Sequence, residues 1–556
     1  MSTHVSRSTL PNAIGAPLRA AGSGWSEALS GNDDQTQEDE APAEKQYLPI
    51  KNQETSQDSP QQPQRPRSHH SLARSYSDGT GFHRASIEEV DMAAGDTANP
   101  TDPEKQFEVR WDGENDPRNP RSMSNPRKWL VVLIVSMSSL CVTSTSSIYT
   151  STYDQITQEF NCSEIVATLG LSLFVIGLGL GPMLLAPLSE FYGRRNIYII
   201  SFAFFVIWLI PCALARNIQT MLIARFLNGL SGSAFLSVAG GTVGDLFSRY
   251  ELHAPMMIYT ASPFLGPEVG PIFGGFINQY TTWRWTFYVL LIWSGVMLAL
   301  IIIFVPETYH PVLLRDKARK LRRDTGNDRW KAPIEMTDRS IAQTLLTSIY
   351  RPFQLLTLEP MCLNLCLFSA VLLGVLYLFF GAFNLVFSSN HGFQLWQIGL
   401  SFSGLLAGLI FGIATDPLWH KNYVRLVNKR ERLGGEPGGS EPEYRLPPAI
   451  AGAILVPIGL FWFGWTTTLL VFSGVFTFLV DAYPLYAASA LAANSFARSS
   501  FAAAFPLFGI QMYNKLGYQW ATTLLAALCV VLAPFPYLFF KYGKRIRGGS
   551  RYATAK

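Results

Sequence analysis

The chain has 556 residues, of which 48% are hydrophobic and 15% charged, and its formal net charge is only +4. So small a net charge does not indicate a nucleic-acid-binding protein, and so few charged residues indicate a chain that keeps much of its length out of water. The mean hydropathy is only +0.16, because a polar N-terminal segment dilutes a strongly apolar remainder.

The first 126 residues are rich in Ser, Pro, Gln, Asp and Glu and contain few apolar clusters. Such a segment buries too little surface to offset the loss of chain entropy, so residues 1–126 are predicted to be a disordered cytoplasmic tail. No apolar run begins near Met1, and we therefore expect no cleavable signal peptide. The first membrane span would then act as the targeting signal.

From Trp129 onward the chain is a series of apolar runs, each about 20 residues long, which is the length that crosses a bilayer. Twelve spans are predicted, and an even number places both termini on one side. The basic clusters fall on that same side, which the positive-inside rule assigns to the cytoplasm. Membrane orientation thus accounts for these clusters without nucleic acid or acidic lipid. The predicted spans are 129–150, 165–188, 196–214, 220–245, 252–277, 284–305, 360–386, 396–416, 447–465, 466–484, 487–511 and 520–540.

This pattern predicts an all-α integral membrane protein with two six-helix halves and a site between them. The central loop opens with Pro306-Glu307-Thr308. The predicted domains are the tail of residues 1–126, an N-terminal half of 127–305, a central cytoplasmic loop of 306–358, a C-terminal half of 359–541 and a cytoplasmic C-terminal tail of 542–556.

A charged turn separates spans 2 and 3. The run 187–195 contains Glu190, Gly193, Arg194 and Arg195. An acid, a glycine and two arginines in so short a turn are suited to lock neighbouring helix ends through hydrogen-bonded charge pairs.

The second half repeats this pattern. Asp416 ends span 8 and is followed four and five residues later by His420 and Lys421, the spacing of the first turn. Asp245 and Asp481 close the fourth span of their respective halves. Asp245 is at the level of the first turn, so it is the expected partner of one of the two arginines there when the cytoplasmic side is closed. The residues predicted to gate the halves are Glu190, Gly193, Arg194, Arg195, Asp245, Asp416 and Asp481.

The repeat also shows a shortfall in the second half. Spans 3 and 4 take 49 residue steps from Asn196 to Asp245, whereas the corresponding pair takes only 34 from Pro447 to Asp481. Thirty-four helical residues reach roughly 51 Å, which is too long for one span and too short for two with a turn. Span 10 is therefore predicted to lack its outer half, with a turn at 465–468.

Span 5 concentrates small residues, prolines and one acid. Its glycines are spaced by four or five residues, so they are expected to line one face and allow a neighbouring helix to approach closely. Its prolines remove backbone hydrogen-bond donors and bend the span. The small residues are Gly266, Gly270, Gly274 and Gly275, and the prolines are Pro263, Pro267 and Pro271.

Glu268 lies about sixteen residues into span 5. A carboxyl group removed from water favours its neutral form, so Glu268 is suited to take up and release a proton near neutral pH. Arg225 in span 4 lies within about 5 Å of the same depth. The two groups are expected to pair if their helix faces agree, either as a static ion pair or as a protonation switch.

Arg498 lies within span 11, where it is expected to extend toward Asp481 in preference to contacting substrate. Asn228 and Asn494 lie one turn from the two intramembrane arginines, and each is expected either to bond to a neighbouring helix or to line a polar cavity. The residues assigned to proton coupling or the substrate cavity are Arg225, Asn228, Glu268, Asn494 and Arg498.

Several of these segments together resemble one known family. The turn at 187–195 resembles the loop between spans 2 and 3 of the major facilitator superfamily, and 222–229 resembles its span 4 motif. Residues 262–275 resemble the antiporter motif of span 5, whose small and proline positions are Gly266, Pro267, Gly270, Pro271, Gly274 and Gly275. Segments 111–129, 283–288 and 480–494 are similar to further parts of the fungal twelve-span drug:proton antiporters.

The resemblance covers about residues 111–545 and implies export driven by a proton gradient. Ala186 and Glu190 depart from the usual pattern, which has Gly and Asp at these positions. The short span 10 is a further departure.

No enzymatic or metal chemistry is indicated. Five of the six cysteines fall in or beside apolar runs, where they act as small apolar residues, and no His or Cys cluster suits a metal ion. Asn161 begins a formal N-glycosylation sequon in a short outer loop, where occupancy is not expected. No Walker sequence is present, so direct ATP hydrolysis is not expected to drive transport.

We therefore expect a non-enzymatic exporter of hydrophobic or weakly cationic small molecules, such as drugs or toxins, that uses the proton gradient and no cofactor. It should act as a monomer in the plasma membrane, with both termini in the cytoplasm and no nucleic-acid partner. Two alternatives remain open. One is an exporter of a specific metabolite, such as a polyamine or a secondary-metabolite toxin. The other is an inactive or sensing membrane protein, which the short span 10 would favour.

Overall fold

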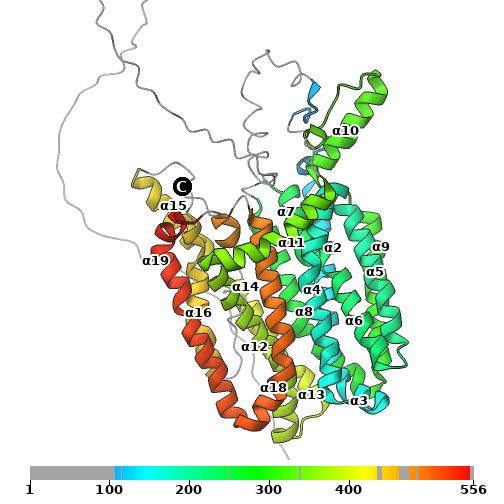
Figure 1. Cartoon of the computed structure of the whole chain (residues 1–556), viewed down its shortest axis with the longest axis vertical. Helices are drawn as coiled ribbons and strands as arrows, with labels where there is room; N and C mark the ends of the chain where they lie inside the picture. Colours follow the sequence, from blue (N-terminus) through cyan, green and yellow to red (C-terminus); the bar gives the residue numbers. More distant parts are fainter. Residues whose placement is uncertain are drawn as a thin grey trace, which may run out of the picture. The chain divides into compact units, whose positions relative to one another are not determined.

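The structure, a computed structural model, describes residues 107–113, 116–248, 251–336, 340–434, 441–461, 475–476, 478–483 and 486–550. The described residues are mostly helical, and their one β feature is an isolated parallel bridge between Glu108 and Lys331. The prediction of an all-α protein is therefore confirmed (Figure 1).

The N-terminal group of helices follows a short 3₁₀ turn, η2 (Pro120–Ser122). It consists of α2 (Asn125–Ser147), the 3₁₀ helix η3 (Ile148–Thr152), α3 (Tyr153–Phe160), α4 (Glu164–Tyr192), α5 (Arg194–Ala213), α6 (Ile218–Gly232), α7 (Ala234–Leu246), α8 (His253–Tyr280) and α9 (Trp283–Phe304).

The connecting segment and the C-terminal group are also helical. The connection holds α10 (His310–Thr325), η4 (Pro333–Met336) and α11 (Ile341–Leu358). The C-terminal group consists of α12 (Pro360–His391), α13 (Leu395–Ser401), α14 (Ser403–Ala414), α15 (Asp416–Arg432), η5 (Pro442–Arg445), α16 (Pro447–Phe461), α18 (Ala487–Leu532) and α19 (Pro534–Gly548).

Eight helical segments of the described residues are long and apolar enough to cross a membrane. Predicted spans 11 and 12 fall in one such segment, and its backbone is non-helical at Gly517, which has a φ of 76°. The predicted turn at 465–468 lies outside the described residues, as does most of predicted span 10. The shortened span therefore stays a prediction.

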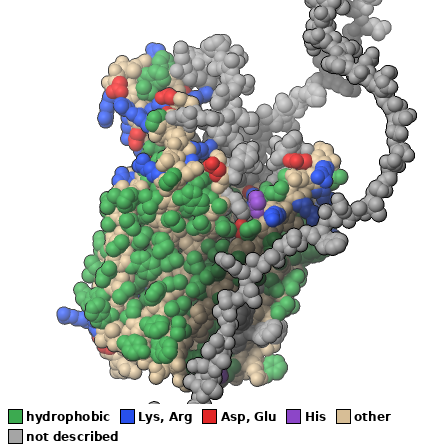
Figure 2. Space-filling view, turned by 180° about the vertical axis from the view of Figure 1, so that it is seen from behind, with side chains coloured by type: hydrophobic (Ala, Val, Ile, Leu, Met, Phe, Trp, Pro, Cys, Tyr) green, Lys and Arg blue, Asp and Glu red, His purple; other side chains and the backbone are tan. Residues whose placement is uncertain are grey.

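The helices expose many large apolar side chains and bury a number of polar ones. Exposed side chains on α5 and α9 include Ile200, Phe204 and Ile292, whereas Ser139 and Asn228 are fully buried. Figure 2 shows hydrophobic side chains covering most of the visible helical face, with most Lys and Arg gathered toward one end. A chain that exposes apolar groups and buries polar ones is matched to lipid, in which backbone groups must be satisfied internally.

The two ends of the bundle can be told apart by two short helices. In Figure 1, α10 lies at one end and α3 at the other, and these are called the α10 end and the α3 end below. At the α3 end the two groups of helices meet through α8 and α13, where Leu395 N–H donates to the Gln279 side chain at 3.1 Å. At mid-depth Ser172 of α4 donates to the Ala503 carbonyl of α18 at 2.7 Å.

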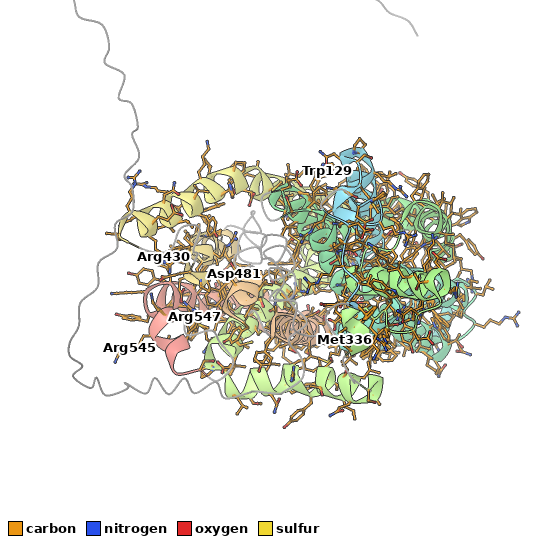
Figure 3. All side chains as sticks on the ribbon, turned by 90° about the horizontal axis from the view of Figure 1, so that it is seen from above. Trp129, Met336, Arg430, Asp481, Arg545 and Arg547 are labelled. Carbon is orange, nitrogen blue, oxygen red and sulfur yellow. The ribbon has the colours of Figure 1, made fainter. Side chains whose placement is uncertain are left out.

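Two segments predicted to lie beyond the spans are helical at the α10 end. His420 and Lys421, predicted to open a loop after span 8, lie inside α15, because 17 residues from Asp416 continue as a helix. Residues 542–548, assigned to a C-terminal tail, belong to α19. Arg547 of α19 is fixed there by Glu443, with nitrogen-to-oxygen distances of 2.7 and 2.8 Å. Figure 3 shows Arg430, Arg545 and Arg547 from this end.

The segment before α2 also departs from prediction, since the disordered tail was expected to run to residue 126. From Phe107 onward the described residues pack against α10 and η4, and Val109 N–H donates to the Lys331 carbonyl at 3.0 Å. The contact has its own small hydrophobic core, made of Val109, Leu314, Ala318 and Ala332. The apolar residues of this segment were too few to reveal the docking without the partner helix.

A buried lysine holds this segment in place. The ammonium group of Lys317 in α10 lies 3.0 Å from an Asp116 carboxylate oxygen and 2.9 Å from an Asp112 oxygen. It also donates to the Arg110 carbonyl at 2.9 Å. Asp116 accepts a further bond from the Arg118 backbone N–H at 2.9 Å, so both buried charges are satisfied.

The docked segment should be released by acid. Burial raises the pKa of Asp116, but hydrogen bonds from the Arg118 and Asp112 N–H groups and from Lys317 outweigh burial, so the pKa lies below its usual value. Asp116 thus stabilises the docked form above the usual Asp pKa, and that contribution is lost as the pH falls through the lowered value. Hydrogen–deuterium exchange of residues 107–124 should show this loss of protection.

In the same experiment Asp116→Asn should expose the segment already at pH 7. Asp112→Asn is the matched control, because the Asp112 side chain is 79% exposed and such pairs contribute little. Full protection of the segment in Asp116→Asn would show that this ion pair does not hold it.

Candidate functional site

A fully buried arginine lies between α2, α4 and α6. Arg225 of α6 is 0% exposed. Its guanidinium donates to three backbone carbonyls, those of Thr145 at 2.8 Å, Ser146 at 3.2 Å and Gly170 at 3.2 Å. The rings of two aromatic residues cover it, each with its centroid 4.4 Å from the guanidinium carbon, namely Tyr149 and Phe174. Carbonyl dipoles and ring faces thus offset the desolvation of this charge.

The carbonyls of Thr145 and Ser146 are available because they lie at the end of α2. The helix ends at Ser147 and continues as the tighter 3₁₀ helix η3. The last carbonyls of an α-helix have no intrahelical partners, so those of Thr145 and Ser146 accept from Arg225. Ser146 also links this site to the other group of helices, since its hydroxyl lies 2.9 Å from that of Tyr377 in α12.

The expected pairing of Arg225 with Glu268 does not occur. Glu268 of α8 is only 6% exposed, makes no ion pair with Arg225, and its Oε2 atom has no hydrogen-bond partner within the described part of the chain. The two residues lie at similar depth, but their helix faces differ. Gly266 and Gly270 of α8 face α2, and Glu268, midway between them, is turned away from it.

Glu268 instead lies on the face of α8 that looks toward the C-terminal group. Gly275, seven residues later and therefore on the same face, packs against α13, where an added Cβ would lie 2.7 Å from the Leu395 carbonyl and 3.2 Å from the Gly399 Cα. The buried carboxyl group consequently faces the boundary between the two groups of helices.

The glycines of α8 were predicted to share one face, and this prediction is wrong. Gly266, Gly270 and Gly274 pack against α2 and η3, whereas Gly275 packs against α13. At Gly266 an added Cβ would lie 2.7 Å from the Leu140 carbonyl and would overlap the Thr143 hydroxyl. The α8 backbone thus approaches a helix on either side, with Pro267 and Pro271 between the glycines.

Arg498 lies at the same boundary, on α18. The predicted extension toward Asp481 is wrong, because Asp481 pairs with Arg445 at 3.1 Å. The Arg498 guanidinium instead packs over the Phe476 ring at 4.7 Å and the Phe264 ring of α8 at 6.0 Å. An aromatic pair, whose centroids are 6.4 Å apart, therefore joins α8 to the C-terminal group beside an arginine.

Both asparagines bond to neighbouring helices. Asn228 donates to the Phe205 carbonyl of α5 at 2.7 Å. Asn494 accepts a bond from Ser369 of α12. Each also keeps one buried side-chain atom without a partner among the described residues, so a role in a polar cavity stays a prediction.

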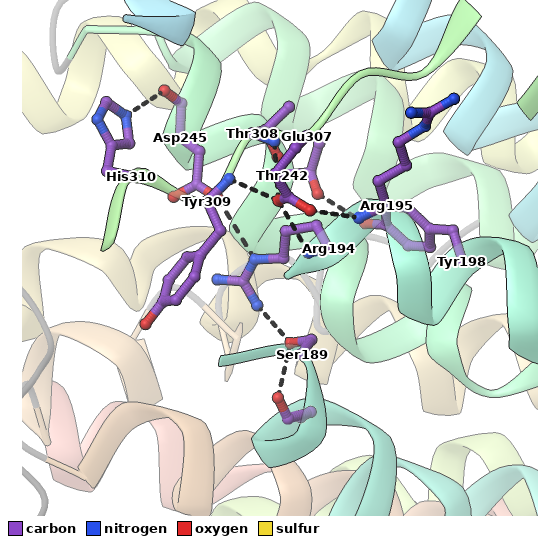
Figure 4. A network of polar contacts seen from close by, with 11 residues as sticks. Ser189, Arg194, Arg195, Tyr198, Thr242, Asp245, Glu307, Thr308, Tyr309 and His310 are labelled. Atoms are coloured by element: carbon purple, nitrogen blue, oxygen red, sulfur yellow. Dashed lines mark hydrogen bonds and ion pairs between the residues drawn. The ribbon is translucent and has the colours of Figure 1, made fainter. Parts of the chain in front are cut away.

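The charged turn at the α10 end contains an ion pair between Arg194 and Asp245, and its dependence on closure of the cytoplasmic side stays a prediction. Arg194 and Asp245 are both buried, and the Arg194 Nε lies 3.3 Å from an Asp245 carboxylate oxygen. Arg194 also donates to the Ser189 hydroxyl at 2.7 Å, and its guanidinium packs over the Tyr309 ring at 4.7 Å (Figure 4). All four residues precede α10, so the described contacts of this pair lie within the N-terminal part of the chain.

Glu307 completes this network and was not predicted as a site residue. Its carboxylate accepts from the backbone N–H groups of Arg194 at 2.9 Å and Arg195 at 3.2 Å, and so it caps the start of α5 (Figure 4). Gly193 has a φ of 91°, and an added Cβ there would overlap the Glu307 carboxylate. The sequence did contain a signal for this role, because Glu307 is an acid that directly follows the last predicted span of the first half.

His310 connects the turn to the docked N-terminal segment. Its Nε2 lies 3.0 Å from the Asp245 carbonyl oxygen, and its ring meets that of Trp111 edge-on at 5.7 Å. Glu190 lies close enough to Arg194 for electrostatic attraction. The turn, α10 and the segment before α2 therefore form one polar network.

Comparison with known proteins accords with this arrangement. Residues 135–505 match the sequence profile described as Major Facilitator Superfamily. The chain is 57% identical over 472 residues to efflux pump atB of Aspergillus terreus, covering 82% of this chain and 91% of that one. The chain belongs to the major facilitator superfamily.

Other members of the superfamily give the same picture. The chain is 39% identical over 454 residues to the probable drug/proton antiporter YHK8 of Saccharomyces cerevisiae, covering 78% and 87% of the two chains. It is 40% identical over 474 residues to the multidrug transporter mdrA of Aspergillus fumigatus, covering 81% and 76%. The chain is thus a multi-pass membrane transporter of the efflux type and not an enzyme.

The remaining predicted residues of this superfamily member lie at its two ends. Asp416 begins α15, and Asp481 pairs with Arg445 at the α10 end. Asn161 is exposed in a left-handed conformation at the end of α3, and its glycosylation stays a prediction. The five cysteines expected in apolar surroundings are buried: Cys141, Cys212, Cys362, Cys366 and Cys529.

Close packing of α2 and α8 should be essential to this transporter. Gly266→Ala would place a methyl group against the Leu140 carbonyl and the Thr143 hydroxyl. Overpacking of this kind costs about 1–3 kcal/mol, so thermal unfolding in detergent should shift downward and transport should fall. Gly295→Ala on α9 is the control, because nothing lies within 4 Å of an added Cβ there. Equal unfolding temperatures for the two variants would contradict this prediction.

Loss of the buried ion pair at the turn should also destabilise the protein. Asp245→Asn leaves the Arg194 guanidinium buried without its counter-charge, at a cost on the order of 3 kcal/mol. Asp316→Asn is the control, because the pairs of Asp316 with Arg315 and Arg319 are exposed and long, at 3.8 and 3.6 Å. We expect a lower unfolding temperature and slower transport for Asp245→Asn alone. An unchanged unfolding temperature and transport rate in Asp245→Asn would show that the Arg194–Asp245 pair has no gating role.

Proposed function

We propose that this transporter exports hydrophobic or weakly cationic small molecules in exchange for protons by alternating access, with Glu268 as the proton-binding group. The observation that carries the proposal is a buried carboxyl group that makes no ion pair with the described residues and faces the boundary between the halves. Two of the relatives are named as a drug/proton antiporter and a multidrug transporter, which supports the same substrate class.

The proton step follows from the surroundings of Glu268. While the carboxyl group is buried, its neutral form is favoured, because an isolated carboxylate is costly away from water. When a rearrangement of the halves brings water to it, the ionised form becomes favourable and the proton leaves. Protonation and the access of each side to the site are therefore linked by one residue.

The direction of access is proposed from charge. Arginines and lysines of α10, α15 and α19 gather at the α10 end, which on the positive-inside rule faces the cytoplasm together with both termini. The described contacts between the halves lie at mid-depth or toward the α3 end. The structure then corresponds to a form closed to the outside. We propose the plasma membrane as its location, because the proposed export leads out of the cell.

Aromatic side chains between the halves suit apolar substrates. Phe276 of α8 lies 5.9 Å from Trp396 of α13, measured between ring centroids. Phe264 and Phe476 form a second such pair deeper in the protein. Ring faces from both halves offer large apolar area with little loss of side-chain entropy on binding. A polyamine exporter would need several acids here, and Glu268 is the one acid deep within the spans of the sequence.

The proposal is tested by removing the titration of Glu268. Purified protein in liposomes should move a fluorescent probe, neutral Nile red or cationic rhodamine 6G, against its gradient when a pH gradient is imposed. Glu268→Gln keeps the shape of the side chain but carries no proton, so we expect at least about a tenfold loss of proton-driven transport, equivalent to ~1.4 kcal/mol of coupling. Probe binding should be retained.

Glu251→Gln serves as the matched control, because Glu251 is exposed in the loop just before α8. It should transport as the unaltered protein does. If Glu268→Gln also keeps the normal dependence on the pH gradient, Glu268 does not carry the proton.

A further inference from the structure

Three charged side chains of the described residues lie deep within the spans: Arg225, Glu268 and Arg498. The other charged side chains of these helices lie near helix ends or on the segments beyond them. Residues 447–480 contain no charge at all. Any ionic interaction of Glu268 in the interior must therefore use one of the two arginines.

Arg225 is not available to Glu268. Its side chain is fully buried, and its guanidinium donates hydrogen bonds to three backbone carbonyls of its own half. In addition, α2 lies between Arg225 and the face of α8 that carries the acid. Arg498 is different, because it is only half-buried and lies on α18 in the opposite half. A pair between Glu268 and Arg498 would join the two halves.

The two groups already share a neighbour. Phe264, whose ring lies 6.0 Å from the Arg498 guanidinium, is one helical turn before Glu268 and on the same face of α8. Arg498 therefore already contacts the face of α8 that carries Glu268, through a residue one helical turn before the acid. Sliding of packed helices by up to one turn is a known element of conformational switching.

Among the described residues, no other charged group lies at this depth to compete for Glu268. The helices that pack against α8 on its two faces, α2, α13 and α14, carry no charged side chain deep in the spans. α7 and α9 carry theirs, Asp245 and Arg284, at opposite ends of the protein. The titratable groups near Arg498 among the described residues are Cys366, Tyr377 and Tyr259, which are all neutral at pH 7 in their usual range.

We infer that Arg498 is the ionic partner of Glu268 in another conformation of the transport cycle, and that their pair locks the empty, deprotonated transporter against switching. In the conformation described here the pair is open, with the guanidinium held over Phe476 and Phe264. The inference rests on the proposed role of Glu268 as the proton-binding group.

Such a lock explains how exchange is enforced. A proton on Glu268 removes its charge and breaks the pair, and a substrate lodged between the aromatic rings of the halves keeps the two groups apart. Either loaded form is then free to switch, whereas the empty form is held by an ion pair in a low-dielectric interior. Protons cannot return without substrate, because the return step would be made by the empty form.

The experiment measures proton leak without any substrate. The full chain is placed in liposomes that contain a pH-sensitive dye, a pH gradient is imposed, and its decay is followed. The unaltered protein should leak little. Arg498→Gln should raise the protein-dependent leak at least about tenfold, which corresponds to loss of ~1.4 kcal/mol of locking. Arg498→Lys keeps the positive charge and should restore most of the lock.

The double variant Glu268→Gln with Arg498→Gln should not leak, because the leaking proton is carried by Glu268. A structural defect from Arg498→Gln would lower transport but would not create a leak that depends on Glu268. Arg319→Gln, an exposed arginine of α10, is the control for loss of one positive charge.

The outcomes separate the inference from the proposed function. Glu268→Gln could abolish proton-driven probe transport while Arg498→Gln shows no increase in proton leak. In that case the inferred lock is wrong, but Glu268 remains supported as the proton-binding group. If Glu268→Gln transports normally, the proposed function fails, and with it the lock. If Arg498→Lys leaks as much as Arg498→Gln, the positive charge is not what holds the empty form, and the inference is overturned.

Discussion

Arg225 carries a positive charge deep among the helices, and the backbone around it is arranged to supply oxygen atoms. Three carbonyls from α2 and α4 accept its hydrogen bonds, and two of them are available because α2 ends at Ser147. The cost of burying the charge thereby fixes where the first helix ends and how α2, α4 and α6 lie against one another. Through Ser146 and Tyr377 the same site reaches the other half.

Once α2 is fixed, the orientation of α8 follows. Gly266, Gly270 and Gly274 let the α8 backbone pack directly on α2 and η3, and a helix held on one face must present the opposite face elsewhere. That opposite face carries Glu268 toward the C-terminal half. The glycines and the acid of one motif therefore serve distinct purposes, packing on one side and titration on the other.

The α10 end is organised around a second buried arginine. Arg194 is held by Asp245 and Ser189, Glu307 caps the helix that Arg194 begins, and His310 connects Asp245 to Trp111 of the segment before α2. Lys317 holds that segment through its ion pair with Asp116, so the chain before the first span is connected by contacts to the turn between spans 2 and 3. Any movement of one must be accommodated by the other.

The sequence by itself determined the helical class, the position of most spans and the residues worth attention, because apolar length and isolated charges in apolar runs are one-dimensional signals. It also placed Asp245 opposite the charged turn, since both close helices at one level. It could not determine which faces of helices meet. Arg225 and Glu268 share a depth, yet they lie on different sides of α2, and Arg498 packs on aromatic rings while Asp481 bonds to Arg445. The docking of the segment near Val109 was not predicted either, because its few apolar residues form a hydrophobic core only together with residues of α10. Helix rotation and long-range docking are set by side-chain packing between distant segments, and only the tertiary structure decides them.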